Sequence, residues 1–222
     1  MFNLRTFSIV LPLLIISVFF NYNANAQPTY LPVGPQTNVP VDTVTEGGWT
    51  ECYRDTYNIF LVVDTVLAQC PGDKLMLSCR PTGSSTLTLL AQAPREDVTF
   101  DTGVNQDVTH IANGVGWYFN DFYSWGFARA GDVVSKDPCD TENSNADERL
   151  CWHTNDDGGW RCGVTTSLNS SVDFERIVYT SSPSPHLRAI PTLSEWGMIA
   201  AAAGLVIVGV YFAVRKRKVV VN

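Results

Sequence analysis

Six cysteines in the middle of the chain constrain its fold more than any other feature of the sequence. They are Cys52, Cys70, Cys79, Cys139, Cys151 and Cys162. An even number of cysteines without a C-x2-C pair favours disulfides over a zinc–thiolate site. The sequence alone does not choose among the many pairings. Local loop closure around "PGD" and "NDDGG" suggests Cys70–Cys79 and Cys151–Cys162, with Cys52–Cys139 as a long-range link. We therefore predict a disulfide-stabilised domain in an oxidising compartment.

The first 26 residues have the layout of a secretory signal peptide. Arg5 precedes an apolar run from Thr6 to Phe20, and Ala24-Asn25-Ala26 forms a small-x-small cleavage site before Gln27. The alternative is a membrane-spanning helix, but an apolar run of about 15 residues is short for a hydrocarbon core of about 30 Å. We expect residues 1–26 to direct export and to be removed.

Two proline-containing segments bound the region that holds the cysteines. Residues 27–46 carry four prolines and no apolar periodicity, and residues 181–189 are rich in serine and proline, so both are expected to be linkers. The residues between them, 47–180, are numerous enough for one domain with its own core. They carry 9 Lys+Arg and 19 Asp+Glu, a net charge of 9 − 19 = −10. This charge repels phosphate backbones and argues against nucleic acid as a partner.

The pattern between residues 47 and 180 is typical of β-structure. Short segments rich in β-branched and aromatic residues alternate with turn sequences such as "PGD", "PTGSS" and "NGVG". We expect a mainly β fold with a single antiparallel domain, either a sandwich or an irregular barrel. The expected strands are 58–68, 74–79, 85–93, 108–112, 116–120, 124–128, 149–154, 160–168 and 176–180. Within the first of these, "TVLAQC" could instead be the end of a helix.

The C-terminal region combines a polar turn, an apolar run and a basic tail. Residues 198–214 are uncharged and almost wholly apolar, and as a helix they would extend about 26 Å, close to the thickness of a bilayer core. The basic residues that follow should stay in the cytoplasm by the positive-inside rule. They are Arg215, Lys216, Arg217 and Lys218. This topology places the preceding domain on the side to which a signal peptide would send it.

The polar turn before the apolar run reads "IPTLSEWG". Its residues are Ile190, Pro191, Thr192, Leu193, Ser194, Glu195, Trp196 and Gly197. With the helix and basic tail, this segment, 190–222, resembles the IPTL-CTERM sorting domain of exported proteins in Gram-negative bacteria. The resemblance implies a membrane-embedded processing enzyme, an exosortase of type H, as partner. It also implies that the chain is anchored in the inner membrane facing the periplasm and is then released to the cell surface or exterior. A permanent membrane anchor is the alternative.

Signs of catalysis in the middle domain are weak. There is no G-x-S-x-G elbow, and His110 and His153 are interpreted as structural or surface residues, while His186 lies in a linker. Neighbouring acids such as Glu96–Asp97 and Asp156–Asp157 are expected in ordinary solvated turns. A secreted hydrolase with a carboxylate pair is the enzymatic alternative. We expect the domain not to be an enzyme.

Calcium is the one cofactor that the acidic loops suggest, and we otherwise expect none. Residues 101–107, 140–148 and 155–159 are rich in oxygen ligands, but none of them fits the EF-hand pattern. Ordinary acidic loops are the competing interpretation, and no metal ligands are assigned.

Tryptophans are the most suggestive residues for function. Aromatic rings beside Asp and Asn suit sugar recognition, because sugar CH faces stack on the rings while hydroxyls bond the polar groups. The candidate ligand-binding residues are Trp117, Trp125, Trp152 and Trp160. The alternative is that they fill the core. We expect an exported, non-catalytic binding module of the cell surface or extracellular matrix, with carbohydrate as the favoured ligand. A purely structural surface protein is the further alternative.

Overall fold

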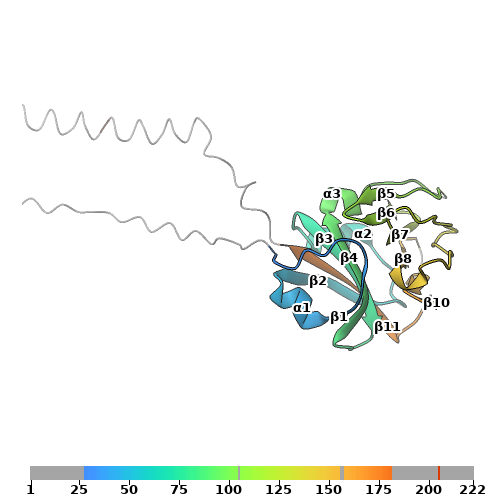
Figure 1. Ribbon diagram of the computed structural model, residues 1–222, viewed down its shortest axis with the longest axis horizontal. Coiled ribbons are helices and arrows are strands. Elements are labelled where there is room, and N and C mark those ends of the chain that lie inside the picture. The colour runs from blue at the N-terminus through green and yellow to red at the C-terminus, as the bar shows by residue number, and fades with distance from the viewer. Residues whose placement is uncertain (1–27, 105, 156–157, 182–204, 206–222) are drawn as a thin grey trace, which may run out of the picture.

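Two antiparallel sheets form the framework of the domain (Figure 1). The computed structural model describes residues 28–104, 106–155, 158–181 and 205. The larger elements of the first sheet and its surroundings are β1 (Gln36–Pro40), α1 (Val41–Glu46), β2 (Trp49–Thr56), α2 (Val63–Gln69), β3 (Lys74–Pro81), β4 (Thr86–Pro94) and β11 (Phe174–Ser181). Between β4 and β11 lie α3 (Arg95–Val98), β5 (His110–Ala112), β6 (Val115–Asn120), β7 (Ser124–Arg129), the 3-10 helix η1 (Ala146–Glu148), β8 (Leu150–His153), β9 (Arg161–Cys162) and β10 (Thr165–Thr166).

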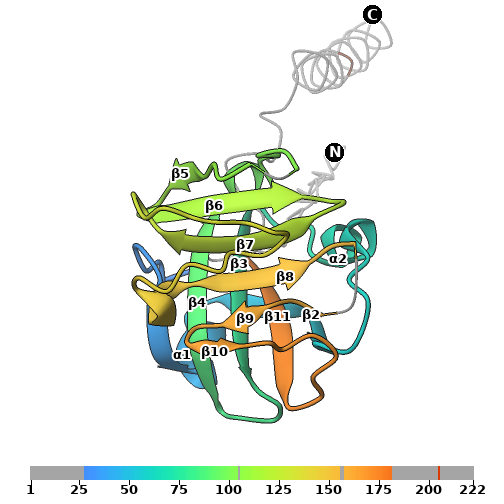
Figure 2. The same cartoon turned by 90° about the vertical axis from the view of Figure 1, so that its right-hand side faces the viewer.

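The two sheets differ in how the chain builds them. The five-stranded sheet has the order β1-β4-β3-β11-β2, so the last strand of the domain is inserted between β3 and β2. The six-stranded sheet, β10-β9-β8-β7-β6-β5, follows the chain as a meander. Strands of one sheet run across those of the other (Figure 2), as in orthogonally packed sheets. The mainly β, antiparallel prediction is confirmed, and the sheets do not close into a barrel.

Turn chemistry explains the hairpins that the sequence predicts. Asn113 and Gly114 join β5 to β6 with φ values of 51° and 74°, and both central residues of a type I′ hairpin turn need such positive φ values. The "PTGSS" turn joins β3 to β4, where Leu77 pairs with Ala91. Eight of the nine expected strand segments contain a strand in the structure.

The remaining segment, residues 58–68, is a correction. Its second half is the helix α2, in which Val63 and Val66 are buried and Leu67 packs against the core. Asp64 and Gln69 are exposed. The spacing i, i+3, i+4 puts the apolar side chains on one face of a helix, whereas a strand would alternate.

Residues 36–46 are a second correction, because they belong to the domain rather than to a linker. Val39 of β1 pairs with Leu87 of β4, and Val44 of α1 is fully buried. Prolines are accepted here since β1 is an edge strand, where the missing N–H interrupts no ladder. The domain therefore begins before residue 47.

Two apolar clusters lie on opposite faces of the five-stranded sheet. The main core lies between the sheets and includes Leu77, Trp117, Phe127 and Val178. The smaller cluster lies on the other face beneath α1 and includes Val44, Trp49, Met76, Ile177 and Tyr179. The N-terminal segment of the domain is thus needed to cover the outer face of this sheet.

The disulfides are present, as predicted, but all three suggested pairs are wrong. The bonds are Cys52–Cys70, Cys79–Cys162 and Cys139–Cys151, and none of the six cysteines is free. Cys79 lies in β3 and Cys162 in β9, so their bond joins the two sheets. Proximity along the chain was a poor guide because sheet packing, not the local turns, determines which cysteines meet.

The targeting segments cannot be compared with the structure in the same way. The predicted signal peptide, 1–26, and sorting signal, 190–218, lie outside the described residues apart from Leu205. In the part of the chain that the structure describes, no helix is long and apolar enough to cross a membrane.

Candidate functional site

The structure places three of the four candidate tryptophans in the core. Trp117, Trp125 and Trp152 are each 0% exposed. The indole Nε1 of Trp125 donates to the carbonyl of Val98 at 2.9 Å, and that of Trp152 donates to the hydroxyl of Tyr57 at 3.1 Å. These three rings therefore cannot stack on a sugar at the surface.

The fourth candidate, Trp160, lies at a different place. It is partly buried and packs against the cluster that contains Tyr118 and the Cys139–Cys151 disulfide. The structure does not bring it together with the other three tryptophans in one surface.

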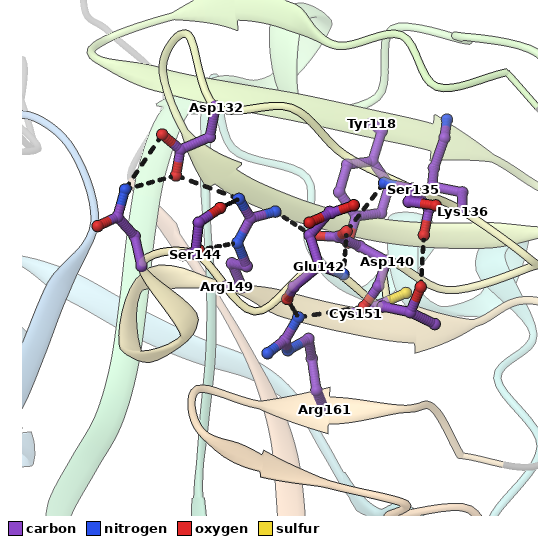
Figure 3. Close-up of polar contacts among 12 residues, drawn as sticks. Tyr118, Asp132, Ser135, Lys136, Asp140, Glu142, Ser144, Arg149, Cys151 and Arg161 are labelled. Carbon is purple, nitrogen blue, oxygen red and sulfur yellow. Dashed lines mark hydrogen bonds and ion pairs between the residues drawn. The ribbon is translucent and has the colours of Figure 1, made fainter.

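The acidic loop between β7 and β8 is organised around a buried ion pair (Figure 3). Asp140 and Arg149 both have fully buried side chains, and Arg149 Nη1 lies 2.5 Å from Asp140 Oδ2. Asp140 Oδ1 also accepts hydrogen bonds from the backbone N–H groups of Ser135 and Glu142. Arg149 Nη2 reaches Asp132 at 3.3 Å. The loop is thus fixed by charge-assisted hydrogen bonds.

A second arginine satisfies the carbonyl groups of the same loop. Arg161 Nη1 donates to the carbonyls of Glu142 and Asp140 at 2.5 and 3.2 Å. Burial lowers the pKa of the Arg161 guanidinium, while the charge of Asp140 acts in the opposite direction. The two guanidinium groups therefore bond the side chain of Asp140 and several main-chain oxygens of this loop.

The acidic loop 101–107 also uses its carboxylates internally, whereas Asp156 and Asp157 of the loop 155–159 lie outside the described residues. Asp101 Oδ1 accepts from the backbone of Gly103 and from Asn120 Nδ2, and these hydrogen bonds, Asn120 first, lower the pKa of Asp101. Asp107 accepts from the backbone of Lys136 at 2.8 Å. Within the described ranges, no group of three or more His, Cys, Asp or Glu side chains is placed to hold a metal ion.

The candidate site with the chemistry of a ligand-binding pocket lies where three loops meet beside α2. The loops precede α2, join β6 to β7, and follow β8, and Figure 2 shows these strand ends next to α2. The pocket has a volume of about 350 Å³. Its lining residues are Phe60, Leu61, Val62, Val63, Asp64, Asp121, Phe122, Thr154 and Asn155. We call it the three-loop pocket.

The three-loop pocket combines exposed rings with hydrogen-bonding groups. Phe60 is 47% exposed and Phe122 is 73% exposed, which is unusual for rings of this size in a domain that buries its tryptophans. Asp64, Asp121 and Asn155 are also exposed on its rim. Flat apolar faces with a few polar groups around them are typical of a small-ligand site.

Buried Arg176 holds two of the three loops in place. Its Nη2 donates to the carbonyl of Ile59 at 2.6 Å and its Nη1 to that of Gly158 at 2.7 Å. The guanidinium lies 5.6 Å from the ring centroid of Tyr57. Gly158 has φ +66°, and a Cβ there would lie 1.8 Å from the carbonyl oxygen of Tyr57. Only glycine therefore allows these loops to approach so closely.

The third loop, the β6–β7 turn, is fixed by Asn120. The side-chain Oδ1 of Asn120 accepts from the backbone N–H of Phe122 at 3.0 Å. Its carbonyl accepts from the hydroxyl of Thr154 at 2.7 Å, and the backbone N–H of Thr154 donates to Tyr123. The exposed ring of Phe122 thus projects from a rigid turn, and a ligand would lose little affinity to ordering it.

A second cavity has less of the chemistry of a binding site. It measures about 550 Å³ and lies near the end of the domain, where Thr180 and Ser181 contribute to it. None of its lining residues is aromatic. Its one carboxylate, Glu51, is paired with Arg54 at 2.9 Å.

His110 and His153 do not line the three-loop pocket, and His186 lies outside the described residues. His110 Nε2 lies 2.6 Å from Asp97 Oδ1, and its imidazole stacks on Phe100 with centroids 4.4 Å apart. His153 is buried at the end of β8. Asp97, one of the neighbouring acids noted in the sequence, is thus paired with a histidine.

The sequence does contain a pattern that indicates one residue of the pocket, although the search for exposed tryptophans did not consider it. Phe122 belongs to the aromatic segment "GWYFNDFYSWGFA", where it directly follows Asn120-Asp121. Asn-Asp is turn chemistry, so a ring directly after it lies in a turn, whereas Phe119 before it and Trp125 after it belong to strands. Phe60 has no comparable local signal.

Comparison of the chain with protein-family models, with curated proteins and with solved structures found no match.

Proposed function

We propose that the domain is a non-catalytic carbohydrate-binding module and that the three-loop pocket is its site. The observation that carries this proposal is that Phe60 and Phe122, both well exposed, line the same pocket as Asp64, Asp121 and Asn155. The rings offer flat apolar faces to sugar CH groups. The carboxylates and the carboxamide accept hydrogen bonds from hydroxyls. The rigid loops support affinity because the site is formed before binding.

The carboxylates also define the enzymatic alternative, a glycoside hydrolase. Asp64 and Asp121 line one pocket, as a carboxylate pair must. Both side chains are exposed, and the desolvation that tunes a catalytic acid is therefore missing at both positions. This exposure favours binding over hydrolysis.

The test of the carbohydrate proposal is a glycan array followed by calorimetry with the purified chain. We expect Phe60→Ala and Phe122→Ala each to weaken binding at least about tenfold, since stacked rings contribute on the order of 1 kcal/mol or more. Phe100→Ala is the matched control, because Phe100 is 51% exposed but does not line the pocket. A blank array, or equal effects of all three variants, would refute the proposal. Release of reducing ends from a bound glycan would favour the hydrolase.

We further propose that the chain is exported and sorted at the inner membrane. Three disulfides indicate an oxidising environment, extracellular or periplasmic. Together with residues 1–26 and the motif at 190–197, they support delivery to the periplasmic side and processing by an exosortase. Intact-mass measurement of the native protein should find a form that lacks residues 198–214. A protein that keeps them, or that matures normally with residues 190–197 scrambled, would contradict this sorting route.

A further inference from the structure

The charges around the three-loop pocket all have one sign. Asp64 lies in the first turn of α2 and Asp121 in the β6–β7 turn, so the two carboxylates reach the pocket from different elements. Both are exposed. Among the residues that the structure describes, no lysine, arginine or histidine lines the pocket.

Neither carboxylate is neutralised by the protein. Within the described part of the chain, Asp64 and Asp121 take part in no ion pair and no hydrogen bond. The arginine that holds two of the loops, Arg176, is buried and donates to main-chain carbonyls. Asp140, by contrast, is buried and paired with Arg149. Within the described residues, the pocket therefore presents two carboxylates from different elements that the protein leaves unpaired.

The two exposed rings favour the same kind of ligand. The face of a phenyl ring attracts a cation, although more weakly than that of Trp. Phe60 and Phe122 therefore add to the attraction of Asp64 and Asp121 for a positive group, while still offering apolar surface to a sugar ring.

We propose that the three-loop pocket selects sugars that carry a protonated amine, such as glucosamine, over their N-acetylated and neutral counterparts. The inference rests on the proposed carbohydrate-binding function and names its ligand class. Acetylation removes the charge and enlarges the substituent, so it should weaken the electrostatic attraction while leaving the ring faces of the sugar unchanged. Attraction between exposed charges is also screened by salt, so the preference should shrink as ionic strength rises.

The experiment measures by calorimetry how tightly the purified chain binds three tetrasaccharides. One is built of glucosamine units, one of N-acetylglucosamine units and one of glucose units. We expect the glucosamine form to bind at least about tenfold more tightly than the other two, and this preference to fall several-fold between low and high salt. Asp64→Asn and Asp121→Asn should each reduce the preference, and the double variant should remove it. Asp42→Asn is the matched control, because Asp42 is also an exposed acid in the first turn of a helix but lies in α1.

The outcomes separate the inference from the function on which it rests. Equal binding of all three tetrasaccharides, or a preference that survives the double variant, would overturn the selectivity while leaving carbohydrate binding in place. Absence of binding by any glycan would remove both. Spermidine serves as a cation without a sugar ring, and binding of spermidine as tight as that of glucosamine tetrasaccharide would overturn the proposal that a sugar is recognised.

Discussion

Arg176 of β11 donates a hydrogen bond from Nη2 to the carbonyl oxygen of Ile59, across 117 positions in the sequence and at a distance of 2.6 Å. The same guanidinium bonds the carbonyl of Gly158, whose own N–H donates to Ile59. A single buried cation in the last strand thus connects two surface loops of the three-loop pocket. The pocket depends on the fold of the whole domain rather than on any local segment.

Replacing Arg176 should therefore damage the pocket as well as the fold. We expect Arg176→Met to cost about 2–4 kcal/mol of unfolding free energy, because several buried carbonyls lose their donor. Hydrogen exchange at Gly158 should become faster even where the domain stays folded. Arg54→Met is the control, since Arg54 is 47% exposed and pairs only with Glu51; it should change stability by less than about 1 kcal/mol. Equal costs for the two variants would argue against a special role for Arg176.

The buried pair Asp140–Arg149 makes a second prediction about stability. Asp140→Ala should destabilise the domain by about 3–5 kcal/mol, because it leaves the Arg149 charge buried with one partner fewer. The exposed pair Arg129–Glu148, at 3.7 Å, is the comparison, and Arg129→Ala should cost less than about 1 kcal/mol. Urea titration of the two variants measures the difference. A small loss for Asp140→Ala would contradict the role of Asp140 as a required partner of the buried Arg149 charge.

The disulfides should differ in how much each adds to the free energy of unfolding, because they close loops of different length. The Cys79–Cys162 bond spans 83 positions and the Cys139–Cys151 bond spans 12. The chain-entropy relation gives about 4.5 kcal/mol for the longer loop and about 3 kcal/mol for the shorter one. Denaturation of the paired Cys→Ala variants tests this order. Non-reducing peptide mapping checks the connectivity directly, and a peptide joining Cys70 to Cys79 would contradict the structure.

Stability should fall steeply in alkali. Burial raises the pKa of Tyr118 well above its usual value and the pKa of Tyr179 to about 12, and burial also raises that of Tyr57. A tyrosine whose pKa is higher in the folded state stabilises the fold below pH 10 and loses that contribution as pH rises from about 10 towards 12. Absorbance at tyrosinate wavelengths should show these three residues ionising only as the domain unfolds. Ionisation of all eight tyrosines near pH 10 in the folded state would contradict this.

Much of the β framework could be predicted because it is locally encoded. The turn at Asn113-Gly114 and the alternation in β3 and β4 identify their hairpins from a few neighbouring residues. The helix α2 was expected only as an alternative, at "TVLAQC", because Val62 and Val63 belong to an apolar run in which β-branched residues favour a strand. The helix is favoured because it packs Val66 and Leu67 on one face against the core.

The site could not be predicted in the same way. The proline-rich appearance of residues 36–46 hid β1 and α1, since pairing with β4 is a long-range contact that leaves no local trace. Tryptophan is equally suited to a core and to a sugar platform, and the structure buries Trp117, Trp125 and Trp152. Phe60 and Phe122, two of the rings that remain exposed, line one pocket only because loops far apart in the sequence fold against each other.

The insertion of β11 between β3 and β2 has a consequence for biogenesis. If the chain crosses a membrane with its N-terminus first, β2 and β3 emerge on the far side before β11, the strand that pairs with both of them. Chaperones of the receiving compartment would meet these unpaired edges during that interval. If the chain is exported as we propose, this sheet can close only after residue 181 has crossed the membrane, so the folding of the domain would wait for the segment that precedes the proposed sorting signal.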